Sequence, residues 1–354
     1  MRNTTLWPGA ALAIGAALLF GASIPVSKWL LGDGTDPQLL AGLFYLGSGV
    51  GLSALKLLQR STARTSEEAP LRRRDLPRLA AAVMIGGALA PALLMLGLKQ
   101  SSASSASLLL NLEGVATMLL AWIVFREHVD RWLLLGALAI VAGALLLSWN
   151  GGLTLNAGAL LIAAACLCWG IDNNLTRALS GADPVQITLI KGLVAGGANV
   201  AMAFSQHRPP PTPALALGAA AVGFFAYGVS LVLFVRALRY LGAARTSAYF
   251  STAPFAGALL AVPMFMEPLS LRLLAAGLLM AVGLYLHLRE SHQHAHRHED
   301  LGHEHRHVHD EHHQHVHAAD DPAAEPHSHW HRHTPMTHSH RHYPDLHHHH
   351  DHPD

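Results

Sequence analysis

The sequence predicts an all-α integral membrane protein of ten transmembrane helices, arranged as two inverted five-helix repeats and followed by a disordered C-terminal tail. Three observations predict this architecture. Apolar stretches of roughly 20 residues recur along the chain, which is the length a helix needs to cross the hydrocarbon core. The second half of the apolar part repeats the first half, and the composition changes abruptly near residue 290.

The apolar stretches dominate the composition. Apolar residues make up 51% of the 354 residues and charged residues only 13%. A soluble domain would carry about a quarter of charged residues, so that class is disfavoured. The stretches are rich in Gly and Ala and show no strict alternation, which argues against a β-barrel. We expect spans at 7–31, 38–58, 79–99, 103–125, 132–149, 155–178, 185–205, 214–238, 246–265 and 271–288.

The internal repeat divides the membrane part into residues 7–149 and 155–289. A shift of 140 residues pairs Phe125 with Phe265 and Glu127 with Glu267. Each repeat has five spans, an odd number, so the two halves must insert with opposite orientations. Inverted repeats of this kind are typical of transporters that work by alternating access around a central site.

Positively charged residues predict the orientation, because they collect in cytoplasmic connections. With both termini in the cytoplasm, 15 Lys and Arg residues outside the tail face the cytoplasm and four face outward. The four are Lys28, Lys99, Arg208 and Arg272. The reversed orientation would invert this ratio, so we expect a multi-pass protein with both termini cytoplasmic.

Three ionisable residues fall inside the spans, namely Glu113, Asp172 and Lys191. Such residues are functional candidates because a charge in the bilayer centre is costly. Glu113 is either a proton- or cation-binding carboxylate or a neutral carboxyl that joins two helices. Asp172 and Lys191 lie at similar depth on neighbouring antiparallel helices, so we expect an ion pair. That pair is either structural or part of a gate on the substrate pathway.

Amide residues complete the predicted substrate pathway. Asn111 precedes Glu113 by two positions, and Asn173 and Asn174 follow Asp172. In the first repeat Pro25 occupies the position that Asn174 has in the second, and a proline inside a helix frees a backbone carbonyl. Pro25 is therefore a candidate helix break facing the polar sixth span. A simple kink with a local hydrogen-bond patch is the alternative.

The tail after residue 290 differs sharply in composition from the membrane part. It holds 24 of the 27 histidines and 11 acidic residues against four Arg, and its few apolar residues predict disorder. Alternating histidines point the same way in an extended chain, so the tail is expected to bind Zn, Ni, Co or Cu. The candidate ligands are His292, His294, His296, His298, His303, His305, His307, His309, His327, His329, His331, His333, His347, His348, His349 and His350.

Catalytic motifs are absent from the sequence. No Gly-rich phosphate loop with a Lys is present, so the chain contains no ATPase of its own. We expect no enzyme activity, no required cofactor and no nucleic-acid partner. The expected partners are the lipid bilayer, a small-molecule or ion substrate and protons as a candidate coupling ion. A monomer and a homodimer both stay open.

Three stretches carry a family resemblance, namely FGASIPVSKWLL, SLLLNLEGVATMLLAWIVFRE and WGIDNNLTRALSGADPVQITLIKG. They resemble the EamA-type domains of the drug/metabolite transporter superfamily, over about residues 10–149 and 155–289. The resemblance implies a ten-helix secondary transporter, often an exporter, in a bacterial inner membrane. The histidine-rich tail has no counterpart in the common family pattern.

The sequence thus favours a secondary transporter that exports a small metabolite or amino-acid-like solute by alternating access, with a metal-binding regulatory or buffering tail. The alternative is a transition-metal exporter whose tail delivers Ni, Co, Zn or Cu to the spans. Apart from the tail, the sequence supplies no His/Asp metal box, so we rank metabolite transport first. A metal sensor or scaffold without transport is the third class.

Overall fold

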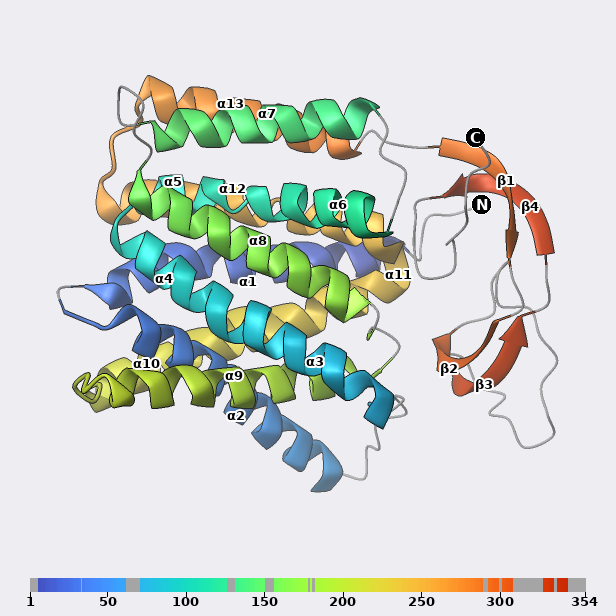
Figure 1. Ribbon diagram of the computed structural model, residues 1–354, viewed down its shortest axis with the longest axis horizontal. Helices are drawn as coiled ribbons and strands as arrows, with labels where there is room; N and C mark the ends of the chain where they lie inside the picture. The colour runs from blue at the N-terminus through green and yellow to red at the C-terminus, as the bar shows by residue number, and fades with distance from the viewer. Residues whose placement is uncertain are drawn as a thin grey trace.

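The computed structural model describes residues 6–32, 34–61, 71–125, 131–149, 156–177, 179 and 182–288, together with four segments of the tail. It is a bundle of long helices, with the tail segments placed beyond one end (Figure 1). Among the described residues, eight helical stretches are long and apolar enough to cross a membrane, and two shorter apolar helices follow them.

The first repeat contains the first five predicted spans. Two of these spans are divided into successive helical segments, because the third contains a π-helical turn and the fourth is interrupted. The elements are α1 (Leu6–Leu31), α2 (Pro37–Ser61), η1 (Arg73–Asp75), α3 (Leu76–Ala82), η2 (Val83–Leu89), α4 (Ala90–Lys99), α5 (Ala103–Leu109), α6 (Leu112–Phe125) and α7 (Arg131–Ser148).

The second repeat follows the same plan, again with a π-helical turn in its third span and an interruption in its fourth. The elements are α8 (Ala157–Arg177), α9 (Pro184–Ser205), α10 (Pro213–Gly223), η3 (Phe224–Val229), α11 (Ser230–Phe250), α12 (Ala253–Phe265) and α13 (Leu271–Leu288). The two π-helical turns occupy matching places, since η3 falls within the range that a shift of 140 residues gives for η2.

Helix α11 differs from the prediction of separate spans at 214–238 and 246–265, because its helical backbone continues to Phe250. The ring centroids of Phe234 and Phe250 nevertheless lie 4.9 Å apart. A straight helix would separate residues sixteen positions apart by about 24 Å, so the chain turns back on itself within α11. This element therefore contains the end of the eighth span and the beginning of the ninth, and the ten-span architecture is preserved.

A capping residue explains why the corresponding turn is visible as a break in the first repeat. There, Ser102 accepts a hydrogen bond from the Ser105 amide at 3.3 Å and starts α5. The position equivalent to Ser102 in the second repeat is Gly242, and the helical backbone of α11 continues through it.

Helix packing follows the repeat. In Figure 1, α2 lies beside α9 and α7 lies beside α13, which are equivalent pairs of the second and fifth spans. Likewise α1 packs on α11 and α12, as α8 packs on α4 and α6. Small residues permit this closeness. A Cβ on Gly49 would lie 2.6 Å from the Leu193 amide, and one on Gly283 would lie 2.6 Å from the Gly136 carbonyl.

The helix break predicted at Pro25 is wrong, because α1 runs without interruption from Leu6 to Leu31. Pro25 cannot donate to the Gly21 carbonyl, and that carbonyl instead faces Gly257 of α12, where a Cβ would lie only 2.7 Å away. The true interruptions lie at Leu110–Asn111 in the fourth span and Ser251–Thr252 in the ninth.

The tail contains strands where the sequence predicts disorder. β1 (His292–His298) pairs antiparallel with β4 (Met336–His342), and β2 (Leu301–His307) pairs antiparallel with β3 (His327–His333). The alternation of His with other residues suits the two-residue period of a strand. Two-stranded ribbons are at best marginally stable in water, so disorder of the tail in solution stays a prediction.

Candidate functional site

Glu113 lies in the first turn of α6, directly after the interruption of the fourth span. Its Oε1 accepts a hydrogen bond from Asn173 Nδ2 of α8 at 2.9 Å. The same amide donates to Thr117 Oγ1 at 3.2 Å, and the Thr117 hydroxyl donates to the Glu113 carbonyl at 2.8 Å. Among the described side chains Glu113 has an amide partner but no cationic partner.

Asn174 extends this polar cluster along the α6–α8 interface. Its Nδ2 donates to the Thr117 carbonyl at 3.2 Å and to the Gly170 carbonyl at 2.8 Å. Asn173 is exposed, Glu113 is half-buried, and a Cβ added to Gly114 would meet nothing within 4 Å. The cluster is therefore only partly covered by packed side chains. A carboxylate, two amides and a hydroxyl can bind a small polar or cationic solute there.

Asp172 and Lys191 form a second polar cluster on another side of α8. Lys191 Nζ lies 2.7 Å from Oδ1 and 2.6 Å from Oδ2 of Asp172, and both residues are buried. Thr176 Oγ1 donates to Asp172 Oδ1 at 2.9 Å. The ion pair expected from their matching depths is thus present in the structure. Both charges are satisfied, as burial away from water requires.

The π-helical turn η2 packs against this ion pair. Its Gly86 has no side chain, and a Cβ there would collide with the Asp172 carboxylate. The Gly86 carbonyl accepts two hydrogen bonds, from Trp169 Nε1 at 3.0 Å and from Tyr45 Oη at 3.2 Å. π-Helical turns often mark functional sites because they alter the regular backbone hydrogen bonding.

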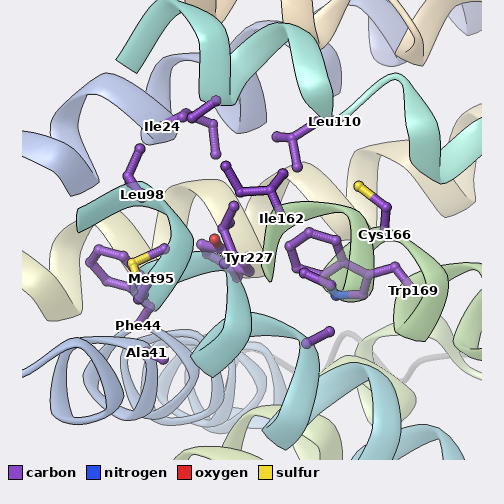
Figure 2. Close-up of a cluster of buried hydrophobic side chains, with 14 of the residues drawn as sticks. Ile24, Ala41, Phe44, Met95, Leu98, Leu110, Ile162, Cys166, Trp169 and Tyr227 are labelled. Atoms are coloured by element: carbon purple, nitrogen blue, oxygen red, sulfur yellow. The ribbon is translucent and has the colours of Figure 1, made fainter. Parts of the chain in front are cut away.

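An aromatic cluster fills the centre of the bundle between the repeats. Ring centroids of Phe20 and Tyr227 lie 5.8 Å apart, those of Phe20 and Trp169 lie 6.3 Å apart, and those of Tyr45 and Tyr227 lie 5.3 Å apart. Figure 2 shows Trp169 and Tyr227 among the apolar side chains of this core. Tyr227 belongs to η3, and its hydroxyl is buried.

Sequence reasoning missed Gly86, Tyr45 and Tyr227. A conspicuous signal was available for the first, since Gly86-Gly87 interrupts an otherwise aliphatic span. A shift of 140 residues takes this pair to Ala226 and Tyr227, so the repeat itself gave no second glycine signal. Tyr45 and Tyr227 carried no signal in the sequence, because a single Tyr in a membrane span commonly serves only to pack against neighbouring helices.

Asn111 lies apart from the other residues of the predicted pathway. It lies at the interruption itself, and its Nδ2 donates to the Leu108 carbonyl at 2.9 Å. Its other neighbour is Met280 Sδ of α13 at 3.8 Å. The structure therefore brings Glu113, Asn173 and Asn174 together, and it brings Asp172 and Lys191 together. Asn111 instead hydrogen-bonds a backbone carbonyl at the end of α5.

The candidate metal ligands predicted from the sequence all lie in the tail. Within the described part of the chain, no group of three His, Cys, Asp or Glu side chains could hold a metal ion. The side chains of all sixteen predicted tail ligands, from His292 to His350, lie outside the described residues. Strand backbones are described for those in β1, β2 and β3, and His309 and His347–His350 lie outside the described residues altogether.

Comparison with known proteins agrees with this architecture. A protein of Methanothermobacter thermautotrophicus, named an uncharacterized transporter, is 27% identical over 79% of this chain and 86% of its own length. The transporter YyaM of Bacillus subtilis, also named uncharacterized, is 21% identical over 69% of this chain and 81% of its own. A crystal structure of a protein shares the fold with a TM-score of 0.59 at 19% identity, over 82% of this chain and 99% of the other.

The family comparison covers both repeats. The model of the EamA-like transporter family matches residues 7–149 and again residues 156–289. These two matches cover most of the chain and all ten spans. They make the protein a membrane transporter of small solutes rather than an enzyme, with the lipid bilayer around its helices. The chain belongs to the EamA-like transporter family.

Proposed function

We propose that this protein is a secondary transporter that exports a small metabolite or amino-acid-like solute across a bacterial inner membrane by alternating access. One observation carries the proposal. Among the described side chains, the half-buried carboxylate of Glu113 has an amide partner and no cationic partner, and it lies directly after the interruption of a membrane span. An intramembrane carboxylate without a cationic partner suits a proton, a cation or the amino group of a solute.

The orientation of the pathway follows from the charges. We call the end of the bundle at which α1 begins and α13 ends the terminal end, and we place it in the cytoplasm. Most Lys and Arg residues of the membrane part lie there, for example Lys56, Arg72 and Arg78, and few lie at the opposite end. Protons are the candidate coupling ion, because Glu113 is a carboxylate that can exchange a proton for solute.

Export is tested by comparing cells that express the protein with cells that express its Glu113→Gln variant. Solutes in the medium and in the cells are measured by mass spectrometry. We expect one or a few amine-bearing metabolites to accumulate in the medium only with the unaltered chain. Equal profiles, with both proteins folded and inserted, would contradict the proposal.

Transition-metal export is the second candidate, and the strand register in the tail favours it. His294 pairs with His340 and His296 with His338, while His303 pairs with His331 and His305 with His329. Residues directly opposite in an antiparallel pair are close neighbours, so the backbone register places histidine positions opposite one another. Histidine is a ligand that suits Zn, Ni, Co or Cu.

The two candidates are separated by metal content. Cells express the full chain, a chain ending after Glu290, or the Glu113→Gln chain, and are challenged with Ni²⁺, Co²⁺, Zn²⁺ or Cu²⁺. Metal export requires that the full chain lowers the content of one metal and that the Glu113→Gln chain does not. Unchanged metal content in all three would leave the tail as a metal buffer or sensor.

A further inference from the structure

The first backbone amides of the fourth span are held by a carboxylate from the second repeat. Ala103 N donates to Glu267 Oε1 at 2.8 Å, and Ser104 N donates to Oε2 at 3.1 Å. The Ser104 hydroxyl donates to the same oxygen. Glu267 is the second residue after α12, and the intervening Met266 adopts a left-handed conformation with φ 51° that turns the chain. A negative charge is favoured at this position, since it faces a helix N-terminus.

A lysine holds the other side of the same break. Lys28 Nζ of α1 lies 2.7 Å from the Leu98 carbonyl and 3.3 Å from the Lys99 carbonyl, at the C-terminal end of α4. A positive charge is favoured there for the complementary reason. The end of α4 and the beginning of α5 are thus bound by charged side chains from two other spans.

Neither helix end depends on these distant charges for its local shape. The Ser105 amide donates to Ser102 Oγ at 3.3 Å, and the Ala106 amide donates to the Ser102 carbonyl at 3.0 Å. At the end of α4, the Gln100 amide donates to the Gly97 carbonyl at 3.1 Å. What Glu267 and Lys28 add is a connection between spans, from α12 to α5 and from α1 to α4.

Packing ties the fourth and ninth spans together at this end. α5 packs on α12 and α1, and a Cβ on Gly257 would lie 2.7 Å from the Gly21 carbonyl and 2.8 Å from Ser107 Oγ. Past the interruption, α6 packs on α8 and α7. Within the described part of the chain, no comparable packing joins α6 to α1 or α12. The fourth span therefore contacts α12 of the ninth span at the opposite end, whereas its α6 part packs on α8 and α7.

We propose that Glu267 and Lys28 form a two-part latch that closes the opposite end of the transport pathway. The carboxylate must leave the beginning of α5 before this end can open. The proposal rests on the alternating access proposed above. The structure is then the state closed at the opposite end, with Glu113 and Asn173 accessible from the terminal end. Both latch residues are half-buried, so water can take over their hydrogen bonds when they separate.

The test measures how fast a water-soluble reagent reaches a position between α5 and α12, and it requires no knowledge of the solute. Ser107 is fully buried between α5 and α12, so Ser107→Cys in a chain carrying Cys166→Ala and Cys168→Ala reports separation of these helices. Right-side-out membrane vesicles are treated with a membrane-impermeant maleimide. We expect Glu267→Gln and Lys28→Gln each to raise the labelling rate about tenfold, which corresponds to about 1.4 kcal/mol.

Matched controls lie at the same end of the bundle. Asp36 caps its own helix through the Leu39 amide at 2.9 Å and pairs with Arg208 at 3.0 Å, so Asp36→Asn removes a carboxylate without touching α5. Lys99 is exposed, so Lys99→Gln is the control for Lys28→Gln. Both controls are expected to label at the parent rate.

The outcomes separate this proposal from the transport function. Parent-rate labelling of Glu267→Gln, in a folded protein that labels fully after SDS, would overturn the latch. If Asp36→Asn raises the labelling rate equally, the latch is overturned as well, because loss of any carboxylate at this end would then loosen the helices. If no protein labels from outside before SDS, the opposite end does not open, and alternating access itself fails together with the latch.

Discussion

Asn173 Nδ2 donates to Glu113 Oε1 at 2.9 Å across the interface of α8 and α6, at the depth where the fourth span is interrupted. The repeat equivalent of Glu113 is Ala253, at the beginning of α12. The fold thus forms the same interruption without a carboxylate. The fold therefore does not require the carboxylate of the first repeat, which is available to bind the solute.

Glu113→Gln is expected to reduce transport at least tenfold while leaving the protein folded. Glutamine has the same size and can still accept the Asn173 hydrogen bond, but it cannot bind a proton or balance a cation. Transport is measured as efflux of the solute identified by the export comparison, and folding as a single gel-filtration peak in detergent. Gly114→Ala is the control, because a Cβ there meets open space. Equal efflux from all three proteins would refute a role for this carboxylate.

The Asp172–Lys191 pair predicts an asymmetry between single and double replacements. Asp172→Asn or Lys191→Met leaves one buried charge without its partner, which costs about 3–5 kcal/mol. The combined variant removes both charges, and most of the lost stability should return. Thermal unfolding of the purified proteins measures this. Transport then distinguishes the two roles, since a structural pair regains transport in the double variant and a pair on the pathway does not.

A more exposed ion pair serves as the control. Lys56 Nζ lies 2.8 Å from Asp183 Oδ2, but a quarter of the Lys56 side chain is exposed. The Asp183 carboxylate that remains is buried, but it still accepts a hydrogen bond from the Val185 amide at 2.8 Å, so Lys56→Met should cost less than Lys191→Met. A loss as large as that of Lys191→Met would show that this hydrogen bond does not compensate for the missing partner.

Gly86→Ala is expected to destabilise the protein and to disturb the buried ion pair. The added Cβ would collide with the Asp172 carboxylate, which lies against η2 and has no room to withdraw. Gly197→Ala, in α9, is the control, because its Cβ would meet nothing within 4 Å. That variant should be neutral or stabilised by up to about 1 kcal/mol, since Ala is the better helix former. Similar unfolding temperatures for both variants would argue against the close approach at Gly86.

The sequence predicted well where a physical rule acts on single spans or pairs of spans. Span length, the repeat and the matching depths of Asp172 and Lys191 led to the ten-helix architecture and to the ion pair. Helix propensity and hydropathy could not locate the interruptions, because tertiary packing decides whether a span bends. Pro25 is held inside a continuous helix, whereas Leu110–Asn111 interrupts a span without any proline at the break.

In the fourth and ninth spans the interruptions are set by the partner helices. A local signal exists only in the ninth, where Pro254 lies in the first turn of α12, a position proline favours. Similarly, nothing in the sequence alone brings Glu267 to the beginning of α5. The capping carboxylate comes from 163 and 164 residues away, and only the inverted arrangement of the repeats places the two at the same end.

The tail predicts a pH-dependent affinity for transition metals. Metal ions bind neutral imidazole, and histidine protonates with a pKa near 6.5. The 24 tail histidines are therefore available at pH 7.5 and are protonated, positively charged and repelled by the metal at pH 5.5. Equilibrium dialysis with Ni²⁺ should find several ions bound per full chain at pH 7.5 and nearly none at pH 5.5. The chain ending after Glu290 should bind nearly none at either pH. Equal binding by the two chains at pH 7.5 would place the metal in the membrane part and revive metal as the transported substrate.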